Sequence, residues 1–161
     1  MTFETTNPAV PADLNPQEQM AWLLNQFVGS VPGVTHAVLA SRDGIKQLYS
    51  DVTRDQADTM AAALSSLLSL CANFPGPDGE KMHPRQVMIE RDDCLIFVTR
   101  AGSTEAFPNL PGSGSGGVDT VLGVLAAPDA NAGDVGFEMS RLVQQFAPYM
   151  TTPVRHEHEV R

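Results

Sequence analysis

The run Gly112–Gly117 reads GSGSGG, and glycines at this spacing could cradle a phosphate group. A phosphate-binding loop of that kind ends in Gly-Lys-Ser/Thr and leads into a helix. Here Val118 and Asp119 follow instead, and then a run with the character of a strand. We therefore interpret the glycine run as part of a flexible loop.

The chain has two cysteines, Cys71 and Cys94, and a thiol nucleophile would need a base such as His36 or His83 beside it. Both cysteines lie inside apolar patterns, which is typical of buried, reduced thiols rather than of a disulfide scaffold. No activating arrangement is evident around either thiol. We therefore predict no catalytic residue and no enzymatic activity.

The C-terminal segment contains His156, Glu157 and His158, whose side chains are all metal-ligand types. A metal site needs ligands that the fold holds in place, and a frayed polar tail does not supply them. We expect adventitious metal contact at most, with no metal site and no cofactor.

Composition favours one globular domain with tails, since 42% of the 161 residues are hydrophobic. The formal net charge of −9, with no Lys or Arg from Ala101 to Ser140, argues against nucleic-acid binding. The absence of a long apolar run argues against membrane insertion. We expect a cytoplasmic protein that reaches membranes only through its partners.

Hydrophobic periodicity predicts an α+β domain with an antiparallel sheet and helices packed on it. The first helix begins after Asn15, an N-cap residue, and Asp43-Gly44 supplies the turn of the first hairpin. Pro148 should stop or kink the last helix. We predict further helices at 53–72 and 131–147, strands at 34–40, 45–50, 85–91, 94–100 and 119–127, a flexible insert at 101–118 within a domain at 15–150, and polar tails at 1–14 and 151–161.

The helix predicted at 53–72 has two distinct faces. One is an apolar stripe at helical spacing: Ala57, Met60, Ala61, Leu64, Leu67, Leu68 and Cys71. The other carries mostly small residues, namely Asp58, Ala62, Ser65, Ser69 and Ala72. No charge follows Asp58 in this helix, so we interpret the second face as a contact surface that another backbone can approach. The alternative is a central helix buried within its own domain.

Several stretches occur together in an order that resembles the bacterial branch of the roadblock/LC7 domain family. They are Trp22-Leu23-Leu24 before Phe27-Val28, VPGVTHAVLASRDG at 31–44, Asp55-Gln56-Ala57-Asp58, QVMIERDDCLIFVTR at 86–100 and GVLAAPDANAGDVGFEMSRLV at 123–143. The resemblance extends from Pro16 to Tyr149. The chain departs from the family pattern at 101–118, where relatives usually turn tightly.

The resemblance implies a five-stranded antiparallel sheet of profilin-like character, in the order α-β-β-α-β-β-β-α, that forms a homodimer. In the family the second helices lie side by side and the third strands pair. The implied interface residues are Arg54, Asp58, Ala62, Ser65, Ser66, Ser69 and Ala72 on the helix, and Val87 and Ile89 on the strand.

The resemblance also implies a function without chemistry of its own. Dimers of this family are scaffolds and regulators of Ras-like small GTPases, some bacterial members stimulate GTP hydrolysis, and a sensor-kinase-like protein is often encoded nearby. The expected partners are therefore a second copy, a small GTPase and a sensor-kinase-like protein. The alternative is a small-molecule sensor or general interaction module, which would show a roomy pocket with convergent polar groups.

Overall fold

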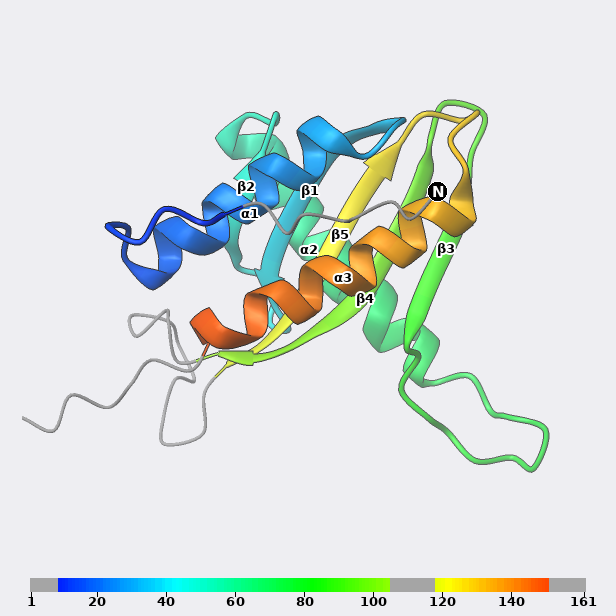
Figure 1. The fold of residues 1–161 in the computed structure, drawn as a ribbon. Coiled ribbons are helices and arrows are strands. Elements are labelled where there is room, and N and C mark those ends of the chain that lie inside the picture. The colour runs from blue at the N-terminus through cyan, green and yellow to red at the C-terminus, as the bar shows by residue number, and fades with distance from the viewer. Residues whose placement is uncertain (1–8, 105–117, 151–161) are drawn as a thin grey trace, which may run out of the picture.

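The computed structural model describes residues 9–104 and 118–150, and it has the predicted order of helices and strands (Figure 1). All strand pairs are antiparallel, and the sheet has the order β2-β1-β5-β4-β3. The elements are α1 (Pro16–Ser30), β1 (Val34–Ser41), β2 (Lys46–Ser50), α2 (Arg54–Ala72), β3 (Gln86–Glu90), β4 (Leu95–Thr104), β5 (Val118–Ala126) and α3 (Ala132–Met150). The predicted fold class is confirmed.

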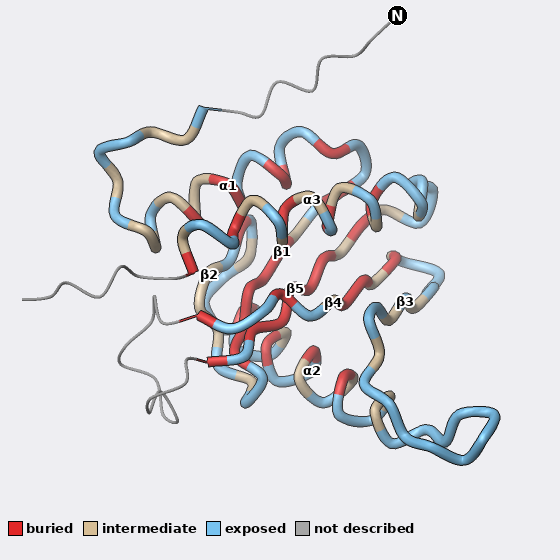
Figure 2. The backbone as a smooth tube through the Cα atoms, turned by 60° about the horizontal axis from the view of Figure 1, so that its bottom comes forward, coloured by how far each residue is buried: buried red, intermediate tan, exposed pale blue. Residues whose placement is uncertain are grey.

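Helices α1 and α3 lie side by side on one face of the sheet, and α2 covers the other (Figure 2). The α1 stripe of Met20, Leu24 and Phe27 meets Phe146 of α3 above the sheet residue Phe97. These side chains are at most 6% exposed. Because burial of apolar surface is the main driving force for folding, this layer is the principal core of the domain.

The α2 face has a smaller core, and its closest contact is at Gly123 of β5. A Cβ atom placed on Gly123 would lie 2.2 Å from Cδ1 of Leu64, so only glycine leaves room for that leucine. Leu64 and Leu68 pack there with Val38, Val98 and other buried residues. The predicted apolar stripe of α2 therefore does face the sheet, and β5 is covered on both sides.

The predicted insert at 101–118 overlaps the sheet at both ends. Strand β4 continues to Thr104 and β5 begins at Val118, with Thr104 paired to Val118. The register shifts between Arg100 and Gly102, where Gly102 has φ +88°, and Ala101 is buried. A bulge at glycine lets the strand continue through a sequence without apolar alternation. The remaining residues of the insert lie outside the described residues.

Helix α3 does not end at Ala147 as predicted, because it continues past Pro148 to Met150. The Met150 side chain is 4% exposed, and its carbonyl accepts a hydrogen bond of 3.1 Å from the buried Thr104 hydroxyl. Pro148 lacks a backbone N–H donor, which weakens the last turn of α3. The tertiary contacts of Met150 stabilise that turn.

The predicted N-terminal tail at 1–14 is described from residue 9, and Val10 is half-buried against the principal core. Residues 1–8 and the predicted C-terminal tail at 151–161, including His156, Glu157 and His158, lie outside the described residues. Within the described ranges, none of the helices has both the length and the apolar character needed to span a bilayer.

Candidate interaction surface

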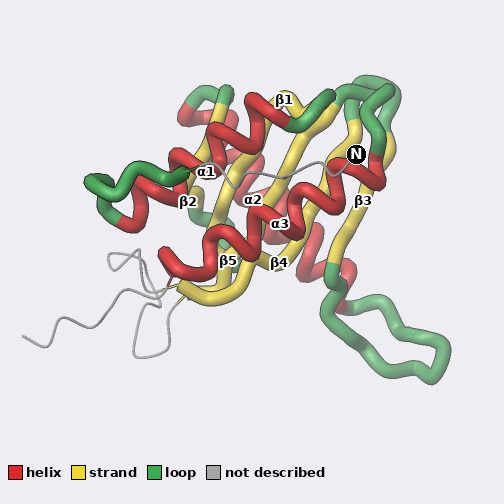
Figure 3. The backbone as a smooth tube through the Cα atoms, in the orientation of Figure 1, coloured by secondary structure: helices red, strands yellow, loops and turns green. Residues whose placement is uncertain are grey.

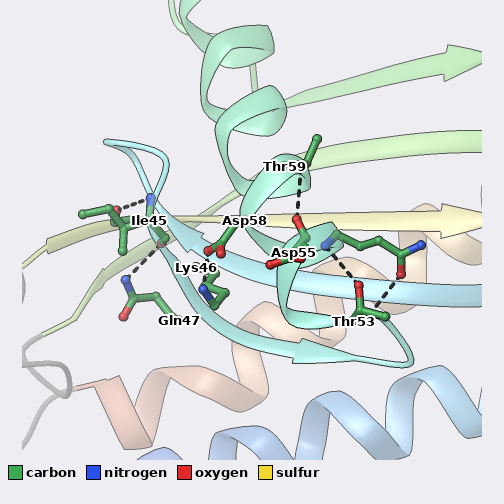
Figure 4. Close-up of polar contacts among 9 residues, drawn as sticks. Ile45, Lys46, Gln47, Thr53, Asp55, Asp58 and Thr59 are labelled. Carbon is green, nitrogen blue, oxygen red and sulfur yellow. Dashed lines mark hydrogen bonds and ion pairs between the residues drawn. The ribbon is translucent and has the colours of Figure 1, made fainter.

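Helix α2 is fixed at its N-terminus by a capping box (Figure 4). The Thr53 hydroxyl accepts a hydrogen bond of 3.2 Å from the Gln56 backbone N–H, and the Gln56 side chain accepts one of 3.0 Å from the Thr53 N–H. Lys46 of β2 forms an ion pair with Asp58 in the second turn. The box satisfies two N–H groups at the helix end and sets the direction in which α2 leaves the sheet edge.

The outer face of α2 consists of the exposed residues Thr59, Ala62, Ala63, Ser66, Ser69 and Leu70. None of them carries a charge, although a solvent-facing helix surface normally bears charged side chains. Of the predicted interface residues, Arg54 and Asp58 are exposed in the first turns, and Ala72 is half-buried at the end. The exposed positions Ala62, Ser66 and Ser69 would allow a second helix to come close.

One flank of the small-residue stripe is already in contact with the chain's own backbone. The half-buried Ser65 donates a hydrogen bond to the carbonyl of Arg42, in the turn between β1 and β2. In the same turn Gly44 has φ +87°, and a Cβ there would lie 3.3 Å from Cα of Ala62. The small residues at 62 and 65 therefore admit this turn, which the sequence did not predict. The available contact surface begins at Ser66 rather than at Ser65.

Strand β3 lies at the edge of the sheet and pairs only with β4 among the described strands. Its outer N–H and C=O groups can therefore pair with another strand, as unprotected edges do. Val87 and Ile89 are half-buried and share the face that α2 covers, with Val87 packed against the α2 core. Strand β3 therefore adjoins α2 at the edge of the sheet.

Sequence reasoning missed the apolar side chains that extend this surface. Leu70 of α2 is 62% exposed, and Phe74 and Met82 are exposed on the connector at 73–85. The connector projects from the body of the molecule (Figure 3), and an isolated antiparallel β-bridge joins Pro75 to Lys81 within it. Leu70 could have been identified, because it lies off the apolar stripe of its helix.

A second apolar patch lies beside β3 on the α3 side. Met88 and Phe137 are 52% and 64% exposed, and they line an open hollow of about 530 Å³ with Gly133, Gly136 and Ser140 of α3. A pair of large exposed apolar side chains next to an open strand edge is typical of a protein contact. Neither residue was among the predicted interface residues.

The two cysteines are free, and both are half-buried rather than buried as predicted. Burial, together with the neighbouring Asp93 carboxylate, raises the pKa of Cys94, so its thiol is less ionised than an ordinary cysteine. Among the residues that the structure describes, no group of three His, Cys, Asp or Glu side chains is placed to hold a metal ion.

A groove between α1 and α3 has a volume of about 440 Å³. Its floor contains Phe27 and Leu142, and its rim carries Asp134, Glu138 and Arg141. Arg141 donates to both carboxylate oxygens of Glu138 at 3.2 Å, so these two charges neutralise each other. Every buried side-chain polar atom in the described ranges has a hydrogen-bond partner. The groove therefore gives no specific support to a sensor function.

Comparison with known proteins identifies the family to which the chain is similar. The family model described as the Roadblock/LC7 domain matches residues 20–107. A solved roadblock/LC7 domain from Streptomyces avermitilis is 38% identical, with 82% of this chain and 98% of that chain covered and a TM-score of 0.65. A second from the same organism is 30% identical, with 79% and 97% covered and a TM-score of 0.57. No curated protein sequence matches this chain.

A more distant similarity links the fold to the gliding protein MglB from Thermus thermophilus. That structure is 15% identical, with 89% of this chain and 96% of that chain covered, and its TM-score is 0.66. At this identity the similarity is one of fold.

Proposed function

This chain belongs to the roadblock/LC7 domain family, and from that premise we propose that it is a homodimeric regulator of a Ras-like small GTPase, without chemistry of its own. The observation that carries the proposal is the uncharged outer face of α2 beside the open edge of β3. A sheet edge and a helix face made of small residues fit a second copy of the same surface, related by a two-fold axis.

Dimerisation would place two α2 helices side by side and join two sheets through β3. A stable interface of this kind buries on the order of 1,000 Å² or more. Val87, Ile89, Ser66 and Ser69 would lie within it, and the exposed Met88 and Phe137 would border it on the other side of the sheet. The paired helices then form a two-fold platform for a partner.

The platform would act on the GTPase by holding its switch loops in one arrangement. Those loops differ between nucleotide states, so a surface that fits one state shifts the balance between them. An inserted arginine finger is not part of the proposal, because Arg54 is the one cation of α2 and lies in its first turn. Any stimulation of hydrolysis would come from repositioning residues of the GTPase itself.

The test is a titration of this protein with a Ras-like small GTPase from its own source organism, in the GDP form and the GTP-analogue form. Preferential binding of one form by at least tenfold is expected. Equal affinity would contradict the proposal, since a partner that does not distinguish two states cannot shift them. A sensor-kinase-like second partner, implied by the family resemblance, stays a prediction.

A further inference from the structure

A small notch bordered by two arginines and a histidine lies beside the C-terminal half of α2. Its floor is formed by Leu68, Thr120 and Val121, and its rim carries Arg42, His83 and Arg100. These rim residues come from the β1–β2 turn, the connector after α2 and strand β4. Three separate segments therefore bring two guanidinium groups and an imidazole to one place in a chain of net charge −9.

The residues that line the notch carry more positive than negative charge. Asp119 is the carboxylate on its rim; Arg42 lies 3.7 Å from one oxygen of this group, and the Ser103 hydroxyl donates to the other at 2.5 Å. Arg100 has no ion-pair partner among the residues that the structure describes. The notch therefore holds one guanidinium more than its carboxylate can neutralise.

The size of the notch limits what can enter it. Its volume of about 30 Å³ is enough for roughly two water-sized groups, since each needs about 10–15 Å³. Each of the two oxygens of a carboxylate is about the size of a water molecule, and a guanidinium can donate hydrogen bonds to both oxygens in parallel. The His83 imidazole supplies a further N–H donor in either tautomer.

The notch also adjoins the proposed contact surface. Ser69 belongs both to the outer face of α2 and to the lining of the notch. In the proposed dimer the notch would therefore lie at the border of the platform formed by the paired helices. A GTPase seated on that platform would bring its own side chains over Arg100.

We propose that this notch binds an Asp or Glu carboxylate of the GTPase partner, with Arg100 as its main cationic contact. The inference rests on the proposed function for the identity of the partner, but not for the existence of a carboxylate site. Two experiments separate these parts.

The first experiment needs no GTPase. Sodium acetate is titrated into ¹⁵N-labelled full-length protein at constant ionic strength, and the backbone amide signals of Arg42, Ser69 and Arg100 are followed by NMR. Saturable shifts are expected in the native protein and in R141Q, and they should be lost in R100Q. R141Q is the matched control, because it removes the same charge from α3 on the opposite face of the sheet. Shifts that do not saturate, or that survive in R100Q, would overturn the carboxylate site, as would tighter binding of inorganic phosphate than of acetate.

The second experiment measures the affinity of the GTPase for the same variants. R100Q should weaken binding at least tenfold and reduce its salt dependence, because one partner of a charged hydrogen-bonded pair is removed. R141Q should bind within twofold of the native protein, and both variants should keep the native oligomeric mass. Equal affinity of R100Q and native protein would overturn the assignment to the GTPase. If native protein binds no GTPase, the proposed function fails, and the acetate titration alone decides whether the notch is a carboxylate site.

Discussion

The two faces of the sheet differ in how completely the chain covers them. On the α1 and α3 face, 20 buried residues form one cluster, whereas on the α2 face the corresponding cluster has seven, among the described residues (Figure 2). On the covered face, charged side chains continue into the middle of α3, at Glu138 and Arg141. On α2 the exposed charged residues are confined to the first two turns, at Arg54, Asp55 and Asp58, and the rest of its outer face bears none.

We infer from this difference a division of roles between the two faces of the sheet. The α1 and α3 face contains the large buried side chains and supplies most of the stability of the domain. The α2 face contains the open strand edge, the uncharged helix surface and the cationic notch. The predictions below test that division, beginning with the largest expected effect.

Truncation of a large side chain in the principal core should have the largest effect. Phe146→Ala, at a fully buried position on α3, should lower the free energy of unfolding by about 3–5 kcal/mol. Gln144→Ala, at an exposed position on the same helix and away from α2, should change it by less than about 0.5 kcal/mol. Urea denaturation measures both. Similar losses in the two variants would mean that burial of Phe146 does not contribute the expected stability.

The α2 layer should be most sensitive at its closest contact with the sheet. Gly123→Ala places a methyl group against Leu64 and should cost about 1–3 kcal/mol in thermal or urea unfolding. Gly29→Ala is the matched control, because a Cβ there meets nothing within 4 Å and alanine favours helix. A Gly123→Ala variant as stable as the native protein would show that α2 can move away from β5 at no cost.

The capping box of α2 should have a smaller effect. Thr53→Ala removes the hydroxyl that accepts from the Gln56 N–H and should cost about 1 kcal/mol. Thr59→Ala removes a hydroxyl within the same helix, where alanine is the better helix former, and should be neutral or slightly stabilising. Equal effects in the two variants would argue against a specific role for the cap.

Most of the fold could be predicted from the sequence because its signals are local. The turn at Asp43 and Gly44, the capping box at Thr53 and the stripe on α2 are each set within a few residues. The errors occur where distant segments decide the outcome. Met150 extends α3 because Thr104, from another element, binds its carbonyl. The sheet includes Ala101 because that residue packs into the principal core.

The candidate surface was less predictable than the fold for the same reason. The small residues of α2 were interpreted as a surface for a partner, and the sequence could not show that the chain's own turn at 41–44 occupies the flank at Ser65. Phe137 follows no apolar stripe, and its neighbour Met88 comes from β3. The rim of the notch joins residues 42, 83 and 100, which no local pattern connects.

The central claim is that the outer face of α2 pairs with a second copy, and the molecular mass in solution tests it most directly. Sedimentation velocity at micromolar concentration should give the native protein twice the 17.3 kDa mass of the chain. Ser66→Arg should give the mass of one chain, because two like charges would meet across the two-fold axis. Ser30→Arg, on the exposed end of α1, should remain a dimer. A native protein with the mass of one chain, or a Ser66→Arg variant with the mass of two, would contradict the account.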